Sequence, residues 1–335
     1  MSEGGSPSIS IVVPVRNGGP ALRSCLMSMA ACVPPPAEII VVDDASTDAS
    51  ASIAADAGAI TVRLFEQKGP AHARNRGAER ARGDLLFFVD ADVVLQPDAT
   101  AQVLDAFTRE PQLGAVFGSY DDDPAEQNFL SQYKNLAHHW FHQRGRADAS
   151  TFWAGCGAVR RDVFARLGGF DESYRRASIE DIEFGSRARR RGCTVRLRKS
   201  LQVKHLKRWT PTSLLLADIR DRALPWGALS LRDGLVDDLN LRWSSRLAAV
   251  TAQAGLVTLV AHWWWPSSVL LTVCLAAVLL LLDAPLYSFF RRKRGLVFAA
   301  RCFLWHWLYY LYASTAFAFA VLRHQWNAHA RADAS

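Results

Sequence analysis

The sequence predicts an α/β protein with a doubly wound, mostly parallel sheet, followed by interfacial amphipathic helices and transmembrane helices. Three observations lead to this prediction. Short apolar runs alternate with helix-like segments over roughly the first 210 residues, and residues 247–322 are almost entirely apolar. Asp90 and Asp92 directly follow one of the short apolar runs, at the point where a strand would end. Repeated strand-helix units of this kind form parallel sheets with right-handed crossovers.

The strands are expected to be apolar along their whole length, because a parallel sheet is covered by helices on both faces. We expect strands at 8–15, 38–44, 61–66, 85–90 and 115–120, and helices at 18–31, 48–57, 70–81 and 98–108. The less regular second half is expected to contain helices at 125–142, 161–167 and 182–191, a strand with a glycine loop at 151–161, and a strand at 194–206.

The composition divides the 335 residues into a soluble part and an apolar part. We expect a cytosolic domain over 1–210, interfacial amphipathic helices over 211–246, transmembrane helices over 247–322 and a tail over 323–335. The polar N-terminus does not resemble a signal peptide, so the first domain is expected to be cytoplasmic. Six scattered cysteines without a CxxC pair favour reduced thiols over disulfides or zinc.

The net charge of +7 is concentrated, because ten cationic side chains and no acid lie between Arg187 and Arg208. Charge alone is compatible with DNA binding. An anionic membrane surface is the better partner, since the cluster precedes the apolar region. We therefore expect a membrane partner and no nucleic acid.

Each of three apolar spans, at 247–265, 267–289 and 298–322, approaches the roughly 20 residues that cross a bilayer. The basic loop 291–294 is expected on the cytoplasmic side. A multi-pass protein of the plasma membrane with a cytoplasmic catalytic domain follows, with the C-terminus outside. The alternative is two crossings with a re-entrant third span.

Asp90 and Asp92 are the strongest chemical signal in the sequence. Two neighbouring carboxylates repel each other and are costly to desolvate, so a hard divalent cation is their natural partner. Mg²⁺ or Mn²⁺ held by one or two carboxylates usually also carries nucleotide phosphates. A nucleotide-phosphate site is therefore predicted at this strand end.

Two further segments carry candidate ligand residues. Asp43 and Asp44 end the second strand, where a carboxylate can accept a hydrogen bond from a base or a ribose hydroxyl. Arg74 lies early on a helix, whose positive N-terminal end favours a nucleotide or its phosphates. His138, His139 and His142 share a helix without a completing acid or cysteine, so they are interpreted as surface or interface histidines.

Six motifs in order resemble the family-2 glycosyltransferases of GT-A fold. They are PVRN at 14–17, VVDDASTD at 41–48, GPAHARNRG at 69–77, FVDADV at 88–93, AGCGAVRRDVFARLGGFDE at 154–172 and EDIEFGSRARRRG at 180–192. The resemblance covers roughly residues 8–210. It implies a nucleotide-sugar donor, a DxD-bound Mn²⁺ or Mg²⁺, and a place in building the cell envelope.

The resemblance also implies roles for individual residues. The donor pocket would contain Pro14, Val15, Asn17, Asp43, Asp44, Arg74, Asp90, Ala91, Gly155, Arg208 and Trp209. Asp90, Asp92 and His205 would contact the metal, and Asp181, paired with Glu180, matches the general base. The other interpretation of Glu180–Asp181 is a helix start capped by Ser178.

These roles predict an inverting transfer of a sugar to a membrane lipid or lipid-linked hydroxyl. A base is needed for a hydroxyl, whereas a lipid phosphate is already ionised near neutral pH. A polyprenyl-phosphate glycosyltransferase, a polysaccharide synthase and a nucleotidyltransferase remain alternatives, as does a non-enzymatic membrane scaffold. Gln202 lies too far before Arg208–Trp209 for the QxxRW element of processive synthases.

Overall fold

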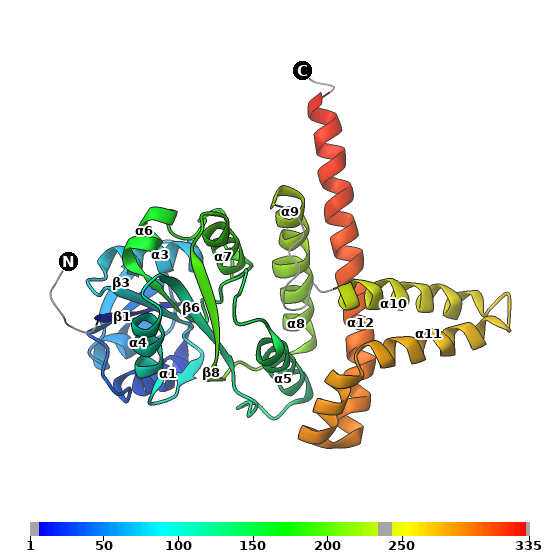
Figure 1. Ribbon diagram of the computed structural model, residues 1–335, viewed down its shortest axis with the longest axis horizontal. Coiled ribbons are helices and arrows are strands. Elements are labelled where there is room, and N and C mark those ends of the chain that lie inside the picture. Colours follow the sequence, from blue (N-terminus) through cyan, green and yellow to red (C-terminus); the bar gives the residue numbers. More distant parts are fainter. Residues whose placement is uncertain (1–6, 234–242, 333–335) are drawn as a thin grey trace. The chain divides into compact units, whose positions relative to one another are not determined.

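The computed structural model describes residues 7–233 and 243–332 (Figure 1). The chain divides into two compact units, residues 1–208 and residues 209–335. The first unit contains an eight-stranded sheet with helices on both faces, and the regular elements in the described part of the second unit are all helices.

The elements of the first unit follow the predicted alternation of strands and helices. The strands are β1 (Ile9–Val15), β2 (Glu38–Asp44), β3 (Ile60–Leu64), β4 (Leu85–Val89), β5 (Val93–Leu95), β6 (Leu113–Tyr120), β7 (Cys156–Arg160) and β8 (Thr194–His205). The helices are α1 (Gly19–Ala30), α2 (Ser50–Asp56), α3 (Pro70–Arg80), α4 (Ala99–Arg109), α5 (Phe129–Arg144), α6 (Arg161–Leu167) and α7 (Glu180–Arg190).

The sheet has the strand order β3-β2-β1-β4-β7-β6-β8-β5. Strands β3, β2, β1 and β4 are parallel to one another, as are β6 and β8. Strand β7 is antiparallel to β4 and β6, and β5 is antiparallel to β8. The mostly parallel sheet is thus confirmed for the first half of the unit, and its carboxyl edge collects the ends of β1, β2 and β4.

Both faces of the sheet are buried, which explains the uninterrupted apolar runs in the sequence. Ile11, Val13 and Phe87 point to one face, where they pack with α1, α2 and α4. Their neighbours in the strands, such as Val12 and Phe88, point to the other face, where they pack with α3, α6 and α7. Full burial of each such side chain contributes about 1.5–3 kcal/mol, so the carboxyl edge rests on a rigid support.

The second unit consists of α8 (Pro211–Asp218), the π-helix η1 (Ile219–Ala223), α9 (Leu224–Asp233), α10 (Trp243–Ala261), α11 (Ser268–Leu282) and α12 (Ala284–Ala332). Helices α10 and α11 pack side by side as a hairpin (Figure 1). Of the predicted interfacial segment 211–246, residues 234–242 lie outside the described residues.

Three apolar helices lie where three spans are predicted, but their lengths differ from the prediction. Among the described residues, α10 alone is long and apolar enough to cross a membrane. Helices α11 and α12 pass the same test only together, and a 72° bend separates them, as in a broken span or a re-entrant loop. Length and composition thus support one or two crossings. Three separate crossings and their orientation are not supported.

Candidate active site

Asp92 and His205 meet because of how β5 pairs with β8. Val93 lies opposite His205 in this antiparallel pair, and the backbone N–H of Leu206 donates to the backbone oxygen of Asp92 at 2.8 Å. The Nε2 atom of His205 is 3.6 Å from Oδ2 of Asp92. Burial opposes ionisation of Asp92, but the neighbouring His205 and the charge of Lys207 lower its pKa nonetheless. Asp92 is therefore a carboxylate at neutral pH.

This pair fits part of a divalent-metal site. The described residues contain no group of three histidine, cysteine or acidic side chains arranged for a metal ion. Mg²⁺ in nucleotide enzymes is usually held by one or two carboxylates, with substrate phosphates and water as the remaining ligands. Asp92 is about one-third exposed, whereas His205 is buried and stacks on Tyr120 at 4.2 Å. The donor set suits an ion whose coordination the substrate completes.

Arg74 links the DxD segment to the start of α7. Its Nη1 donates to Oε1 of Glu180 at 2.7 Å, and its Nη2 donates to Oδ1 of Asp90 at 2.8 Å. The side chain is only 5% exposed and lies over the ring of Phe170, 5.7 Å from its centre. Although burial disfavours the charged form, Asp90 and Glu180 raise the pKa of Arg74 further. Arg74 therefore holds Asp90 and Glu180 in place. If Arg74 also contacts the donor phosphates, as predicted, it must do so with the same guanidinium that bonds to these two acids.

Asp181 lies in the first turn of α7 and is half-buried. Oδ2 accepts from the backbone N–H of Ala154 at 3.1 Å, and Oδ1 accepts from that of Ile182 at 2.8 Å. Burial and the adjacent Glu180 raise the pKa of Asp181 to about 7, although the charge of Arg74 opposes the shift. A carboxylate that titrates near neutrality can take up a proton during turnover.

Glu180 is more deeply buried than the adjacent Asp181. It is 3% exposed, and its second oxygen accepts from the backbone N–H of Ser178 at 2.8 Å. The residue before α7 is Ile179, and no side chain caps this helix. The segment is a helix start, as the alternative interpretation expects, but the predicted cap by Ser178 is wrong, because Ile179 is the N-cap residue. Glu180 is buried and orients Arg74, whereas Asp181 is half-buried.

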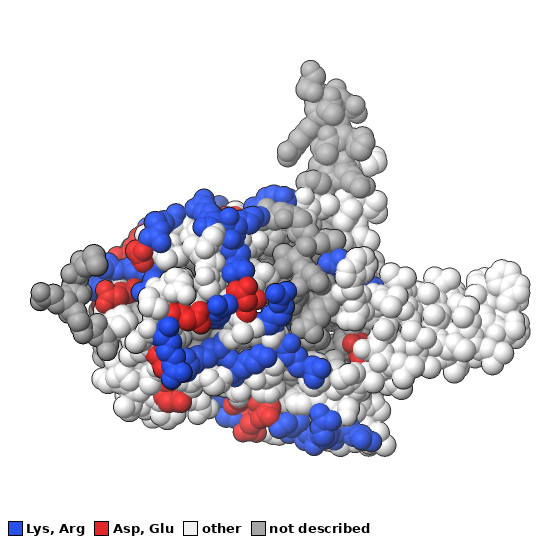
Figure 2. Space-filling view, viewed as in Figure 1, with Lys and Arg blue, Asp and Glu red and all other residues white. Residues whose placement is uncertain are grey.

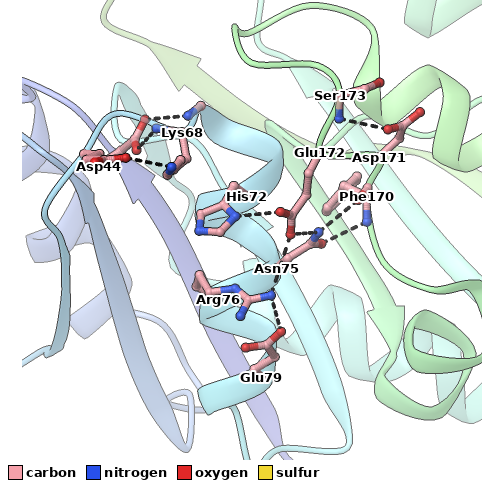
Figure 3. A network of polar contacts seen from close by, with 12 residues as sticks. Asp44, Lys68, His72, Asn75, Arg76, Glu79, Phe170, Asp171, Glu172 and Ser173 are labelled. Atoms are coloured by element: carbon pink, nitrogen blue, oxygen red, sulfur yellow. Dashed lines mark hydrogen bonds and ion pairs between the residues drawn. The ribbon is translucent and has the colours of Figure 1, made fainter.

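The predicted base-binding residues are engaged in holding loops. Oδ1 and Oδ2 of Asp44 accept from the backbone N–H groups of Lys68 and Gly69, at 2.7 and 2.9 Å (Figure 3). Asp43 accepts from the backbone N–H of Ser46 at 2.9 Å. Asn17 has a positive φ of 56°, and its side-chain oxygen accepts from the backbone N–H of Thr47 at 2.8 Å. These bonds fix the loops at the carboxyl edge.

Comparison with known proteins identifies the domain that contains this site. The model of the family described as "Glycosyl transferase family 2" matches residues 10–168. "Probable glycosyltransferase YdaM" of Bacillus subtilis (strain 168) is 27% identical over 206 residues, which cover 57% of this chain and 48% of YdaM. "O-antigen biosynthesis protein RfbC" of Myxococcus xanthus is 32% identical over 184 residues, 52% of this chain and 14% of RfbC. Residues 10–168 belong to glycosyltransferase family 2.

The fold agrees with this assignment. A mannosyltransferase from Pyrobaculum calidifontis, solved in complex with GDP-Man and Mn²⁺, superimposes with a TM-score of 0.64 at 21% identity, over 90% of this chain and 88% of that one. The chain thus has the predicted GT-A-type fold. The chain spans less than half the length of YdaM and RfbC, so these likenesses concern a part of each relative.

A second polar network, which sequence reasoning did not assign, ties α3 to the loop before α7 (Figure 3). Oδ1 of Asn75 accepts from the backbone N–H of Phe170, and its Nδ2 donates to Phe170 O and to Glu172, all at 2.9 Å. His72 pairs with Glu172 at 2.6 Å. Two of the family motifs contain these residues, but their mutual contact spans about 100 positions and is invisible in either motif.

The remaining predicted donor residues come from several segments of the chain. Pro14 and Val15 end β1 and are buried, and Ala91 lies between the two DxD acids. The backbone N–H of Asp90 donates to Gly155 O at 3.2 Å, which joins the DxD segment to the glycine loop. Arg208 pairs with Glu126 at 3.0 Å, and Trp209 begins the second unit. Their contacts with a donor remain predictions.

The three histidines of α5 do not form a surface group. Nδ1 of His139 donates to Tyr120 O at 2.8 Å, and Nδ1 of His142 donates to Gly118 O at 3.0 Å. His138 packs against Trp153, with 4.7 Å between ring centres. The surface interpretation is wrong because apolar and aromatic neighbours from β6 and the glycine loop cover this helix face.

Proposed function

We propose that this glycosyltransferase moves a sugar from a nucleotide-sugar donor, UDP- or GDP-linked, to a hydroxyl of a membrane lipid or lipid-linked acceptor, with inversion at the anomeric carbon. The observation that carries the proposal is the position and acidity of Asp181. Its carboxylate is fixed by the N–H of Ala154 beside the glycine loop, and Glu180 and Arg74 connect its helix to Asp90.

Asp181 acts as the general base in this proposal. In a single displacement the acceptor oxygen bonds to the anomeric carbon while the bond to the diphosphate breaks, and the acceptor proton passes to Asp181. A base is most effective when its pKa is near the working pH, and burial beside Glu180 supports such a value here. The fixed N–H of Ala154 leaves the carboxylate oriented before the acceptor arrives.

Asp92 and His205, with Asp90 beside them, would hold Mn²⁺ or Mg²⁺. The bound ion would supply positive charge to the departing diphosphate. The Mn²⁺ and GDP-Man in the structurally similar mannosyltransferase support a metal and a nucleotide-sugar donor. Arg74 contributes by orienting Asp90 at the same edge.

A membrane acceptor is supported by the surface of the second unit. Most exposed large apolar side chains of the described residues lie in α10, α11 and α12. Figure 2 shows charged side chains over the first unit and an almost uncharged surface on α10 and α11. Large apolar surfaces of this kind mark contact with membranes or other proteins. We propose a plasma-membrane enzyme of the cell envelope, with its catalytic domain on the cytoplasmic side.

The test compares Asp181→Asn with the matched variant Asp162→Asn. Asp162 is exposed at the start of α6, where it pairs with Arg166, so its variant should behave as the unmodified protein. Purified protein is incubated with a panel of radiolabelled sugar nucleotides and total membrane lipid, and donor binding is measured by calorimetry. We expect Asp181→Asn to lose about 10²–10⁴-fold in turnover with donor affinity nearly unchanged. Retained turnover would remove Asp181 as the base.

A further inference from the structure

The second unit contains an apolar groove that the transfer reaction does not use. It has a volume of about 540 Å³ and lies between the end of α11 and two parts of α12. Leu280 comes from α11, Tyr287 and Arg291 come from the first part of α12, and Leu296, Ala300 and Phe303 come from the second part. Its volume lies within the range of roughly 300–1,000 Å³ that is typical of ligand pockets.

A break in α12 creates this groove. Gly295 has φ 85° and ψ 175°, outside the helical region, so the segments before and after it are separate helices. Two hydrogen bonds fix them relative to each other. The Tyr287 hydroxyl is 3.0 Å from Nδ1 of His306, and the Tyr310 hydroxyl donates to Asp283 at 2.9 Å. The groove is therefore held in shape by buried polar contacts.

The walls of the groove are hydrocarbon, and several of them are exposed. Leu296 is 72% exposed and Leu280 is 46% exposed, although a large apolar side chain is usually covered. A hydrocarbon chain laid along these side chains would provide that cover.

One side of the groove is cationic. Arg291 contributes to the lining, and three further cations follow it in the chain before Gly295. Nη1 of the next residue, Arg292, donates to the hydroxyl of Ser288, another lining residue, at 2.8 Å. A guanidinium forms short, strong hydrogen bonds with phosphate oxygens. Apolar walls with a cation at their border match a lipid that carries a phosphate.

We propose that this groove binds a phosphate-bearing membrane lipid, with one hydrocarbon chain against Leu280, Leu296 and Phe303 and its phosphate against Arg291. The site lies wholly within the second unit. It does not depend on the acceptor proposed above, and the lipid can be a structural or regulatory ligand of the helices.

The test uses native mass spectrometry on the detergent-solubilised full chain with two probes, dioleoylphosphatidic acid and dioleoylglycerol, which differ only in the phosphate. The unmodified protein should bind the phosphatidic acid about tenfold more tightly, the value for one charge-assisted hydrogen bond of about 1.5 kcal/mol. Arg291→Gln should remove this preference. Its control is Arg301→Gln, an exposed arginine of α12 outside the lining.

A second pair of variants tests the hydrocarbon contact. Ala300 lines the groove but is exposed, so Ala300→Phe should fill the groove without entering the core and weaken both lipids about tenfold. Ala318→Phe adds the same bulk at an exposed site elsewhere on α12. Inorganic phosphate should not displace the lipid. The proposal is overturned if Arg291→Gln keeps the preference, if Ala300→Phe and Ala318→Phe bind alike, or if inorganic phosphate competes.

Discussion

Substitution of Arg74 by methionine should strongly destabilise the catalytic unit. Methionine keeps most of the apolar stem but removes the guanidinium that bonds to Glu180 and Asp90 at 2.7 and 2.8 Å. Glu180 is 3% exposed, so its carboxylate would remain buried without its cation. The matched control is Arg80→Met, an exposed arginine at the end of the same helix.

The expected size follows from the burial of this ion pair. Removing one partner of a buried ion pair typically destabilises a protein by about 3–5 kcal/mol. In a domain of 150–250 residues, each kcal/mol lowers Tm by roughly 2–4 °C. The lower bound of about 3 kcal/mol thus corresponds to a decrease of roughly 6–12 °C. Arg80→Met should change Tm by less than about 2 °C.

Differential scanning calorimetry of the full chain in detergent measures these changes. A double variant, Arg74→Met with Glu180→Gln, should recover part of the loss, because no charged group is then left unpaired in the interior. The reasoning is refuted if Arg74→Met melts like Arg80→Met, or if the effects of the two substitutions are additive.

The remaining predictions concern the base, the metal and one glycine. Because the pKa of Asp181 is raised from 3.8 to about 7, the ionised form opposes folding: stability from this group is present below about pH 4 and is lost as the pH rises toward 7. Activity should rise with pH through about 7, and a rate that does not change with pH would contradict the role of Asp181 as base. Above about pH 7, Asp181→Asn should melt at a higher temperature than the unmodified protein. Asp92→Asn should weaken Mn²⁺ binding about tenfold in calorimetry, and full activity in excess chelator would exclude the metal. A Cβ at Gly69 would lie 2.5 Å from the Arg175 carbonyl carbon, so Gly69→Ala should lower the free energy of unfolding in urea by more than about 2 kcal/mol. The control is Gly58→Ala, which should lower it less, because Gly58 also has a positive φ but has open space around it.

The fold of the first unit could be predicted because its information is local. The apolar runs at 38–44 and 85–90 are read directly as strands, and they end within one residue of β2 and β4. The antiparallel insertion of β7 between β4 and β6 was not predicted. It depends on pairing between residues about 70 positions apart, such as Leu86 and Val159, which leaves no periodic signal.

The residue types of the site were predictable, but their partners were not. The sequence marks Arg74 and Asp44 as polar groups at strand and helix ends. It does not reveal that Arg74 bonds to Glu180, 106 positions away, or that Asp44 closes the loop at Lys68 and Gly69. In the structure Arg74 and Asp44 bond to other parts of the protein and hold the site together, whereas the motifs predicted that they would contact the donor.

The helices of the second unit show a limit of hydropathy. Residues 267–289 form one apolar run in the sequence, but Asp283 divides it, and its carboxylate accepts from Tyr310. An acid in an apolar run can end a helix when a distant hydroxyl satisfies it. That partner lies in another span, so the break was not visible in the composition.

The anomeric configuration of the product tests the central claim most directly. With Asp181 as base and a single displacement, nuclear magnetic resonance of the product from an α-linked donor should show a β-linked sugar. An α-linked product would contradict the account, because retention requires either a second displacement or attack from the face of the departing diphosphate.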